Sequence, residues 1–138
     1  MGTFANIFQN NTASSAYTDI DPITAAKELS RFRIVDVREE GEYFGPMSHI
    51  DRAELVPMGT VAEHSKHWDK NEEILLICRS GGRSANVAMF LASQGFKNLY
   101  NLAGGMMMWE RHGLGSCKDG FHPEAQGALV GCQAAAAV

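Results

Sequence analysis

Short apolar runs, separated by polar segments that contain glycine or proline, recur along the chain and predict alternating strands and helices. Five of these runs are typical of strands in a sheet, and they are residues 17–20, 34–37, 54–56, 74–77 and 98–102. One helical pattern begins at Asp21-Pro22. Four further helical patterns cover residues 42–44, 58–69, 83–94 and 106–112. Strands that alternate with helices predict an α/β fold with a doubly wound, mostly parallel, five-stranded sheet flanked by helices.

The ends of two helices are marked by their residues. Asp21 is a typical N-cap with Pro22 at the first helical position. Gly95 is a typical residue beyond a helix end, and Phe96 is placed to fold back on the last turn. We therefore expect these two helices to begin and end at these residues.

The alternating pattern is confined to residues 17–113, which we predict to be one domain. Residues 1–16 are rich in Asn, Ser, Thr and Ala and indicate a flexible lead. Residues 114–138 are rich in Gly and Ala and indicate an irregular tail. A chain of 138 residues is long enough to bury one proper core.

Composition and charge exclude several classes of protein. Hydrophobic residues make up 45% of the chain, and the net charge of −4 argues against a nucleic-acid surface. No apolar run approaches the length of a membrane span, and residues 1–12 lack the pattern of a signal peptide. Three cysteines without close pairing give no disulfide framework, so we expect a reducing, cytoplasmic location.

The strongest chemical signal is Cys78, which closes the apolar run 74–77 and is followed by Arg79, Ser80, Gly81, Gly82 and Arg83. Two glycines allow the loop to curl with its N–H groups inward. These donors, the next helix N-terminus and two guanidinium groups favour negative charge on the sulfur. Such surroundings lower a thiol pKa from about 8.5 to about 3.5–7.5 and make a nucleophile.

The plainer interpretation is that Cys78 is a small buried hydrophobic residue. Two arginines beside an inert thiol would be costly to bury, which favours the reactive interpretation. The hypothesis fails if the thiol is walled off from solvent and the surrounding amides face outwards.

Several blocks together carry a family resemblance: Asp36-Val37-Arg38, Glu42-Tyr43, His49-Ile50, Cys78 to Ala85, Gly95-Phe96, and Leu102 to Gly105 with Trp109. In this order and spacing, from about Tyr17 to Gly113, the chain resembles a single-domain rhodanese. The resemblance implies a rhodanese-like fold and a sulfurtransferase of the thiosulfate:cyanide type. The chain departs from the family at Ser48, where glycine is usual before the His-Ile pair. The resemblance therefore does not fix the shape of the segment around Ser48.

The same resemblance implies roles for individual residues. Cys78 is the nucleophile and persulfide carrier, and the backbone amides from Arg79 to Arg83 form its cradle. Arg79 and Arg83 attract an anionic sulfur donor such as thiosulfate, and a persulfide or polysulfide donor remains open. The acceptor is cyanide, a thiol or an acceptor protein. The family needs no organic cofactor and no metal.

Three other functions stay open. Cysteine-dependent phosphatases and arsenate reductases also use a loop from cysteine to arginine, but with five intervening residues, whereas this chain has four. Ile77 also replaces the histidine often seen before a phosphatase cysteine. The second alternative is a non-catalytic, regulatory rhodanese-like module that binds a partner. The third is a redox or metal protein that uses Cys117 and Cys132.

The remaining candidates have a structural and a chemical interpretation. Asp36 and Arg38 support the site, and a salt bridge that shapes the strand end is favoured over catalysis. His49 is expected to hold its turn by a hydrogen bond. His64 and His67 favour a solvated helix face over a metal site, and Met106 to Met108 with Trp109 favour core packing. For Cys117, an unreactive thiol is favoured over one that resolves the Cys78 persulfide, and Cys117, His122 and Cys132 lack regular zinc spacing.

Overall fold

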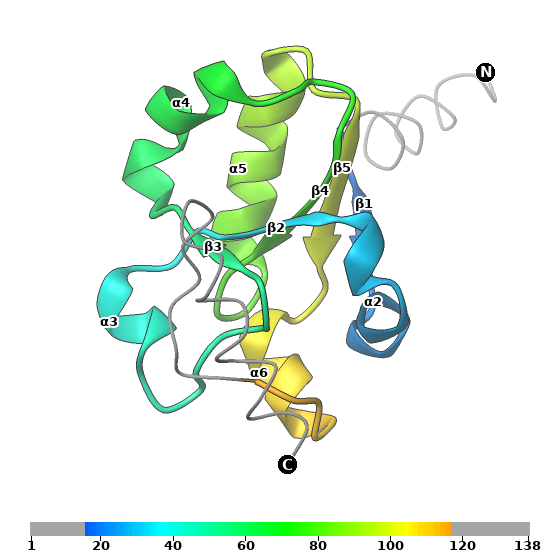
Figure 1. Cartoon of the computed structure of the whole chain (residues 1–138), viewed down its shortest axis with the longest axis vertical. Coiled ribbons are helices and arrows are strands. Elements are labelled where there is room, and N and C mark those ends of the chain that lie inside the picture. Colours follow the sequence, from blue (N-terminus) through cyan, green and yellow to red (C-terminus); the bar gives the residue numbers. More distant parts are fainter. Residues whose placement is uncertain (1–15, 117–138) are drawn as a thin grey trace, which may run out of the picture.

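The computed structural model describes residues 16–116, which form a five-stranded sheet with helices on both faces (Figure 1). In chain order the elements are β1 (Thr18–Ile20), α2 (Pro22–Lys27), η2 (Leu29–Arg31), β2 (Arg33–Asp36), α3 (Glu40–Tyr43), β3 (Glu54–Leu55), η3 (Met58–Thr60), α4 (Val61–His64), η4 (Ser65–His67), β4 (Glu73–Ile77), α5 (Gly82–Ser93), β5 (Asn98–Leu102) and α6 (Gly105–Arg111). The label η marks a 3₁₀ helix. Within residues 16–116, no helix is both long and apolar enough to cross a lipid bilayer.

The sheet has the strand order β1-β5-β4-β2-β3, and every neighbouring pair is parallel. The prediction of a doubly wound parallel α/β sheet is therefore confirmed. Parallel strands bring their carboxyl ends to the same edge, and Figure 1 shows α6 beyond the arrowhead of β5 at this edge. Loops that leave this edge are where open α/β sheets bind ligands.

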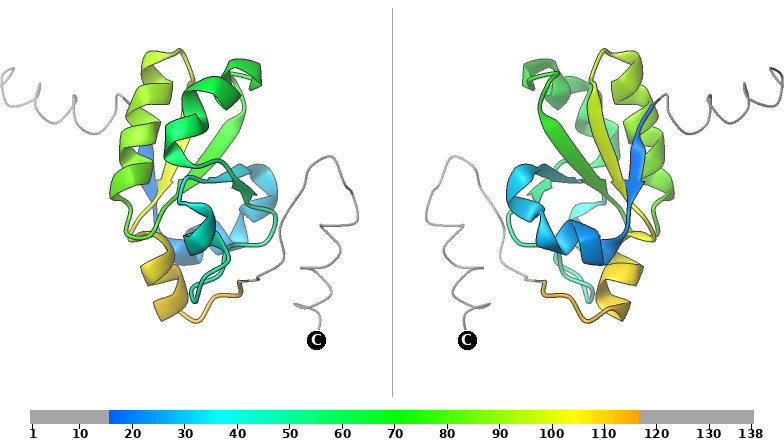
Figure 2. Two further views of the ribbon diagram at one scale, coloured as in Figure 1. Left: turned by 90° about the vertical axis from the view of Figure 1, so that its left-hand side faces the viewer. Right: turned by 90° about the vertical axis from the view of Figure 1, so that its right-hand side faces the viewer.

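The central strand β4 divides the core into two clusters by simple alternation. Ile74 and Leu76 face α4 and α5, whereas Leu75 and Ile77 face the side covered by α2 and α6. Figure 2 shows these helices on opposite faces of the sheet. These four of the five β4 side chains are fully buried, as expected of a strand with helices on both faces.

The expected helix ends are confirmed. The Asp21 carboxylate accepts the Thr24 N–H at 2.9 Å, which caps α2. After α5, Gly95 has a φ of +98°, and the Phe96 N–H donates to the Leu91 carbonyl at 3.1 Å. Both ends are set by residues no more than five positions apart in the sequence.

The single helix expected over residues 58–69 is wrong, because this segment consists of the three short pieces η3, α4 and η4. Val61, Ser65 and Trp68 are nevertheless all buried, as expected of one face of an amphipathic helix. The Ser65 hydroxyl donates to the Ala62 carbonyl at 3.4 Å, a side-chain bond that competes with regular helical bonding.

Candidate active site

The Cys78 loop is clamped between the sheet and α6. The N–H groups of Met106 and Met107 donate to the carbonyls of Cys78 and Arg79 at 2.9 and 3.0 Å. Such a close approach requires Gly105, which has a φ of +59°. A Cβ on Gly105 would lie 2.4 Å from the Arg79 carbonyl oxygen and 2.5 Å from that of Cys78. The start of α6 therefore fixes the backbone that carries the thiol.

The loop directs hydrogen-bond donors at the Cys78 sulfur. Gly81 has a φ of +104° and donates its N–H to Sγ at 3.0 Å, and the Ser84 hydroxyl lies 3.3 Å from Sγ. Burial alone would raise the pKa of the thiol. The Ser84 hydroxyl and the loop amides outweigh burial and lower the Cys78 pKa below its usual value. The expectation of inward-facing donors and a depressed thiol pKa is confirmed.

The thiol itself is covered. Only 1% of the Cys78 surface is exposed, so the thiol is walled off from solvent in this conformation, but the Gly81 amide faces inward. Only one of the two conditions under which the hypothesis of a reactive thiol fails is therefore met. The adjacent Arg79 and Ser80 are exposed. A reagent can therefore reach Sγ only when the atoms that cover it move.

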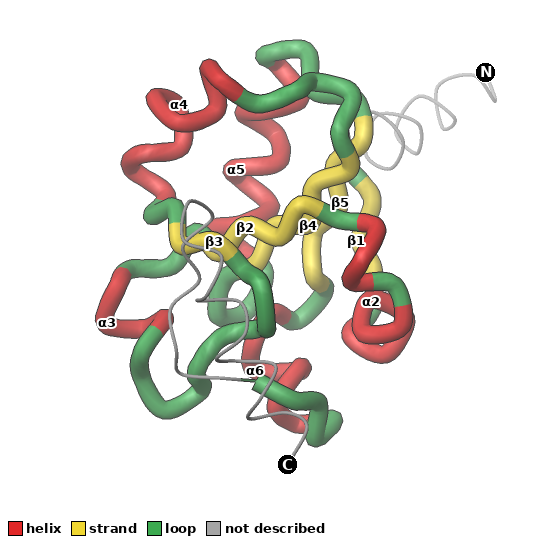
Figure 3. Tube along the Cα trace, in the orientation of Figure 1, coloured by secondary structure: helices red, strands yellow, loops and turns green. Residues whose placement is uncertain are grey.

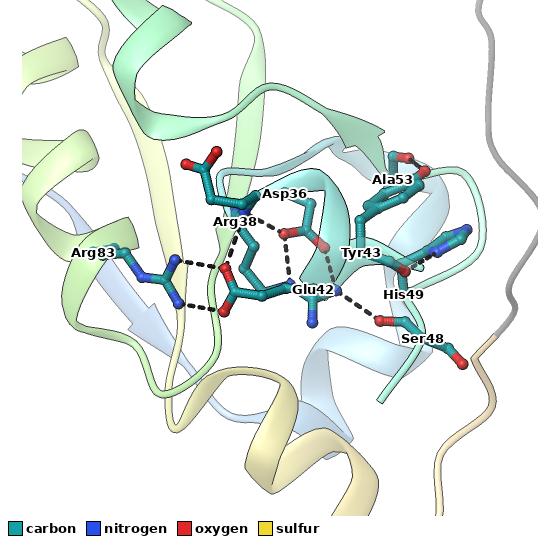
Figure 4. Close-up of polar contacts among 9 residues, drawn as sticks. Asp36, Arg38, Glu42, Tyr43, Ser48, His49, Ala53 and Arg83 are labelled. Atoms are coloured by element: carbon teal, nitrogen blue, oxygen red, sulfur yellow. Dashed lines mark hydrogen bonds and ion pairs between the residues drawn. The ribbon is translucent and has the colours of Figure 1, made fainter. Parts of the chain in front are cut away.

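The two loop arginines have different surroundings, contrary to the expectation that both guanidinium groups converge on the sulfur. Arg83 donates from Nη1 and Nη2 to the two Glu42 carboxylate oxygens, each at 2.8 Å (Figure 4). This ion pair is the main reason that the pKa of Glu42 falls to about 2. Arg79 instead extends from the loop into solvent. Most of the charge of Arg83 is therefore compensated, whereas Arg79 is open to an anion.

Asp36 and Arg38 form the predicted salt bridge at the end of β2. Both side chains are fully buried, with Arg38 Nη2 2.8 Å from Asp36 Oδ2 and Arg38 Nε 2.9 Å from Oδ1. Arg38 Nη2 also donates to the Ser48 carbonyl at 2.6 Å (Figure 4). Its Nη1 is buried and finds no acceptor among residues 16–116. The pair thus joins the strand end to the segment between α3 and β3, which Figure 3 draws as a long loop.

That loop also contains His49 and Ser48. His49 Nδ1 lies 2.8 Å from the Tyr43 carbonyl, and its ring stacks on the Tyr43 ring, so the predicted structural role of His49 is confirmed. Ser48 has a φ of +55°, a left-handed conformation that glycine adopts without steric cost. Ser48 therefore stands at a position whose backbone conformation favours glycine.

A cavity of about 520 Å³ lies beside the loop. Its walls come from α3 and the residues after it, the Cys78 loop, and α6. The lining residues are Arg38, Gly41, Glu42, Pro46, Met47, Arg79, Met107 and Glu110. Its volume is within the range of small-molecule sites. Met107 lines this cavity and is 46% exposed, so the expected core packing holds for Met106 and Trp109 but is wrong for Met107.

Two of the other candidates, His64 and His67, do not line this cavity. His64 and His67 are exposed, consistent with a solvated face. Cys117, His122 and Cys132 lie outside the described residues. Sequence reasoning gave no separate role to Glu42, Ser84 or Asn101, which all contact the loop. A signal existed for Asn101, since it alternates with Leu99 and therefore lies on the same face of the predicted strand as this apolar residue.

Comparison with known proteins gives one consistent family. The model of the rhodanese-like domain matches residues 21–112. The putative sulfurtransferase YtwF of Bacillus subtilis is 46% identical over 90 residues, which are 65% of this chain and 82% of that protein. Thiosulfate sulfurtransferase GlpE of Coxiella burnetii is 38% identical over 79 residues, 57% of this chain and 72% of GlpE. The crystal structure of a rhodanese-like domain protein from Staphylococcus aureus superposes with a TM-score of 0.62 at 32% identity, covering 72% of this chain and 97% of that one.

Proposed function

This chain belongs to the rhodanese-like domain family, and from that premise we propose that it is a sulfurtransferase that carries sulfane sulfur on Cys78. The observation that supports the proposal best is the hydrogen bond from the Gly81 N–H to Sγ at 3.0 Å. A fixed donor at this distance stabilises negative charge on sulfur without reorganisation during the reaction.

In the loading step, the Cys78 thiolate attacks the outer sulfur of an anionic donor such as thiosulfate. A bond forms between Sγ and this sulfur, and the bond to the sulfite group breaks. Sulfite leaves with the electron pair, and Cys78 becomes a persulfide. The depressed pKa of Cys78 increases the fraction of thiolate available for this attack.

In the unloading step, cyanide or a thiolate attacks the outer sulfur of the persulfide. The new bond joins the acceptor to this sulfur, the bond between the two sulfur atoms breaks, and the electron pair returns to Sγ. The product is thiocyanate or an acceptor persulfide. The donors around Sγ then stabilise the leaving thiolate.

Attraction of the anionic donor is assigned to Arg79 and to the cavity beside it. Arg79 is exposed and lines this cavity. Arg83, with Ser80 and Gly82, shapes the loop, and its own charge is largely paired with Glu42. Catalysis requires reduced Cys78, a state that a reducing compartment such as the cytoplasm maintains.

The test is the intact mass of the protein after incubation with thiosulfate. We expect the native chain to gain the mass of one sulfur atom, and we expect Cys78→Ser to gain none. Cys117→Ser is the matched control, because it removes a thiol outside the described residues and is expected to load normally. Sulfur that still loads on Cys78→Ser would refute the assignment.

Sulfur loading and a phosphatase assay together separate two of the alternatives. A non-catalytic binding module would not load sulfur from thiosulfate, a persulfide or polysulfide in any variant. A cysteine-dependent phosphatase would instead hydrolyse an aryl phosphate in a Cys78-dependent manner. Either result would replace the sulfurtransferase proposal.

A further inference from the structure

Asn101 is a buried polar residue in the middle of the core, and no role has yet been assigned to it. It lies on β5, is only 4% exposed, and faces the same side of the sheet as Leu76 and Leu99. Burying an amide is costly unless its donors and acceptor are paired. The partners of Asn101 therefore indicate why a polar group is placed there.

The hydrogen bonds of Asn101 fix the orientation of its amide. Nδ2 donates to Asp19 Oδ1 at 3.0 Å and to the Gly81 carbonyl at 3.2 Å. The parallel register sets Asp19 beside Asn101. A flipped amide would turn its oxygen toward these two acceptors, so Oδ1 must face Ser84, whose hydroxyl donates to it.

The Ser84 hydroxyl stands between two acceptors and has only one hydrogen. One acceptor is Asn101 Oδ1, and the other is Cys78 Sγ at 3.3 Å. A neutral thiol can donate its own hydrogen to Ser84 Oγ, which leaves the hydroxyl hydrogen for Asn101. A thiolate has no hydrogen, so the hydroxyl must turn to Sγ, and Oδ1 then loses its donor.

We propose that Asn101 is a positioning residue that acts on Cys78 through Ser84, by holding the hydroxyl hydrogen while the sulfur is neutral and releasing it to Sγ when the sulfur becomes an anion. That the Ser84 hydrogen changes its acceptor during a reaction cycle rests on the proposed function. There, Sγ is a neutral bridging atom in the persulfide and receives the electron pair when the bond between the sulfur atoms breaks. The competition between Sγ and Oδ1 exists without any substrate.

Charged groups from the surrounding elements also face this centre. Arg83 approaches from α5, paired with Glu42 of α3, and the buried Asp36 and Arg38 lie at the end of β2. Asp19 of β1 faces Asn101 from the other side. All five groups are retained in the variants below, so a change in the pKa of Cys78 does not come from the loss of a charged group.

The experiment measures the pKa of Cys78 in the full chain from the pH dependence of its alkylation by iodoacetamide. Mass spectrometry of the peptide that contains Cys78 separates its reaction from that of Cys117 and Cys132. We expect Asn101→Leu to lower the Cys78 pKa by about 0.5–1 unit, because Ser84 then has one acceptor instead of two. We expect Ser84→Ala to raise it.

The double variant distinguishes an action through Ser84 from a general effect of the substitution. In the Ser84→Ala background, Asn101→Leu should leave the pKa unchanged. The matched control is Asn98→Leu, on the same strand, whose Nδ2 donates to the Asn71 carbonyl and not to the loop. Asn98→Leu should leave the pKa of Cys78 at its native value.

A raised or unchanged pKa in Asn101→Leu overturns the proposal, as does an equal shift in both backgrounds. Circular dichroism checks that each variant is folded, and Asn101→Ala, with the same expected direction, replaces Asn101→Leu if the larger residue prevents folding. Sulfur loading from thiosulfate is measured in parallel. Loading without the pKa shift refutes only the role of Asn101, whereas the shift without loading refutes only the sulfurtransferase.

Discussion

At the scale of single residues, Glu42 determines how much positive charge the Cys78 loop presents. Its carboxylate binds Arg83 through both oxygens and also accepts the Glu39 N–H at 3.0 Å, which completes the cap of α3. One side chain thus joins α3 to α5 across the cavity. The Arg83 and Glu42 side chains are 36% and 33% exposed, so solvent screens the pair and its contribution to stability is modest.

The Glu42 pair predicts a pH dependence of stability. The folded pKa of Glu42 is about 2, below its ordinary value of 4.5, and hydrogen bonding to Arg83 is the main cause. A carboxylate with a depressed folded pKa stabilises the fold above the unfolded pKa, and this contribution disappears as the pH falls toward 2. We expect Glu42→Gln, which keeps the capping side chain, to be about 0.5–1 kcal/mol less stable at pH 7.

Denaturant unfolding at pH 7 and at pH 2–3 measures this difference. The gap between the native chain and Glu42→Gln should narrow as Glu42 becomes protonated. Glu63→Gln is the matched control, because the Glu63–Lys66 pair is more exposed and longer, at 3.5 Å. A gap for Glu42→Gln that is the same at both pH values would contradict the assignment.

At the scale of elements, the first turn of α6 holds the catalytic loop proposed here. Its amides bind the carbonyls of Cys78 and Arg79, and this contact requires backbone to pass backbone at Gly105. The thiol of Cys78 is therefore positioned by helix α6, which begins at Gly105, 27 residues later in the chain. Replacement of Gly105 should disturb the loop as well as the helix.

We expect Gly105→Ala to destabilise the fold and to change the alkylation rate of Cys78, since the new Cβ would lie 2.4 Å from the Arg79 carbonyl oxygen. Gly113→Ala is the matched control. Gly113 also has a positive φ, +70°, but a Cβ there meets nothing within 4 Å. Both variants carry the left-handed cost of about 1–2 kcal/mol, and Gly105→Ala adds the clash. Thermal unfolding of the two variants should differ, and equal melting temperatures would refute the close contact.

At the scale of the whole molecule, one of the two core clusters extends to the residues just after α6. Trp109 is 2% exposed and its Nε1 donates to the Gly115 carbonyl at 2.9 Å. Leu114 packs on the cluster that contains Trp109, and its N–H donates to the Trp109 carbonyl. The domain end predicted at residue 113 therefore excludes two residues that contact the core.

These contacts predict different stabilities for two truncated chains. A chain that ends at residue 113 loses the acceptor of the buried Trp109 N–H, which costs about 1–3 kcal/mol. A chain that ends at residue 116 retains it. Denaturant unfolding of both, with the full chain as reference, should rank the shorter one lowest. Equal stability would mean that Leu114 and Gly115 lie outside the domain.

Much of the fold follows from short-range patterns along the chain. The apolar runs determined the strands, Asp21-Pro22 determined the start of α2, and Gly95 determined the end of α5. The position of Cys78 at a strand end beside a glycine-containing loop also follows from its neighbours. These features are predictable because strand alternation, capping and turn preferences act over only a few residues.

The tertiary structure alone decided which distant side chains meet at the thiol. Glu42 and Arg83 are 41 positions apart, and Asp19 and Asn101 are 82 apart. Their contacts depend on the strand order and on the direction in which packed helices present their faces. The burial of Cys78 was decided in the same way. Contacts of this kind depend on how all elements pack together, so no local pattern in the sequence contains them.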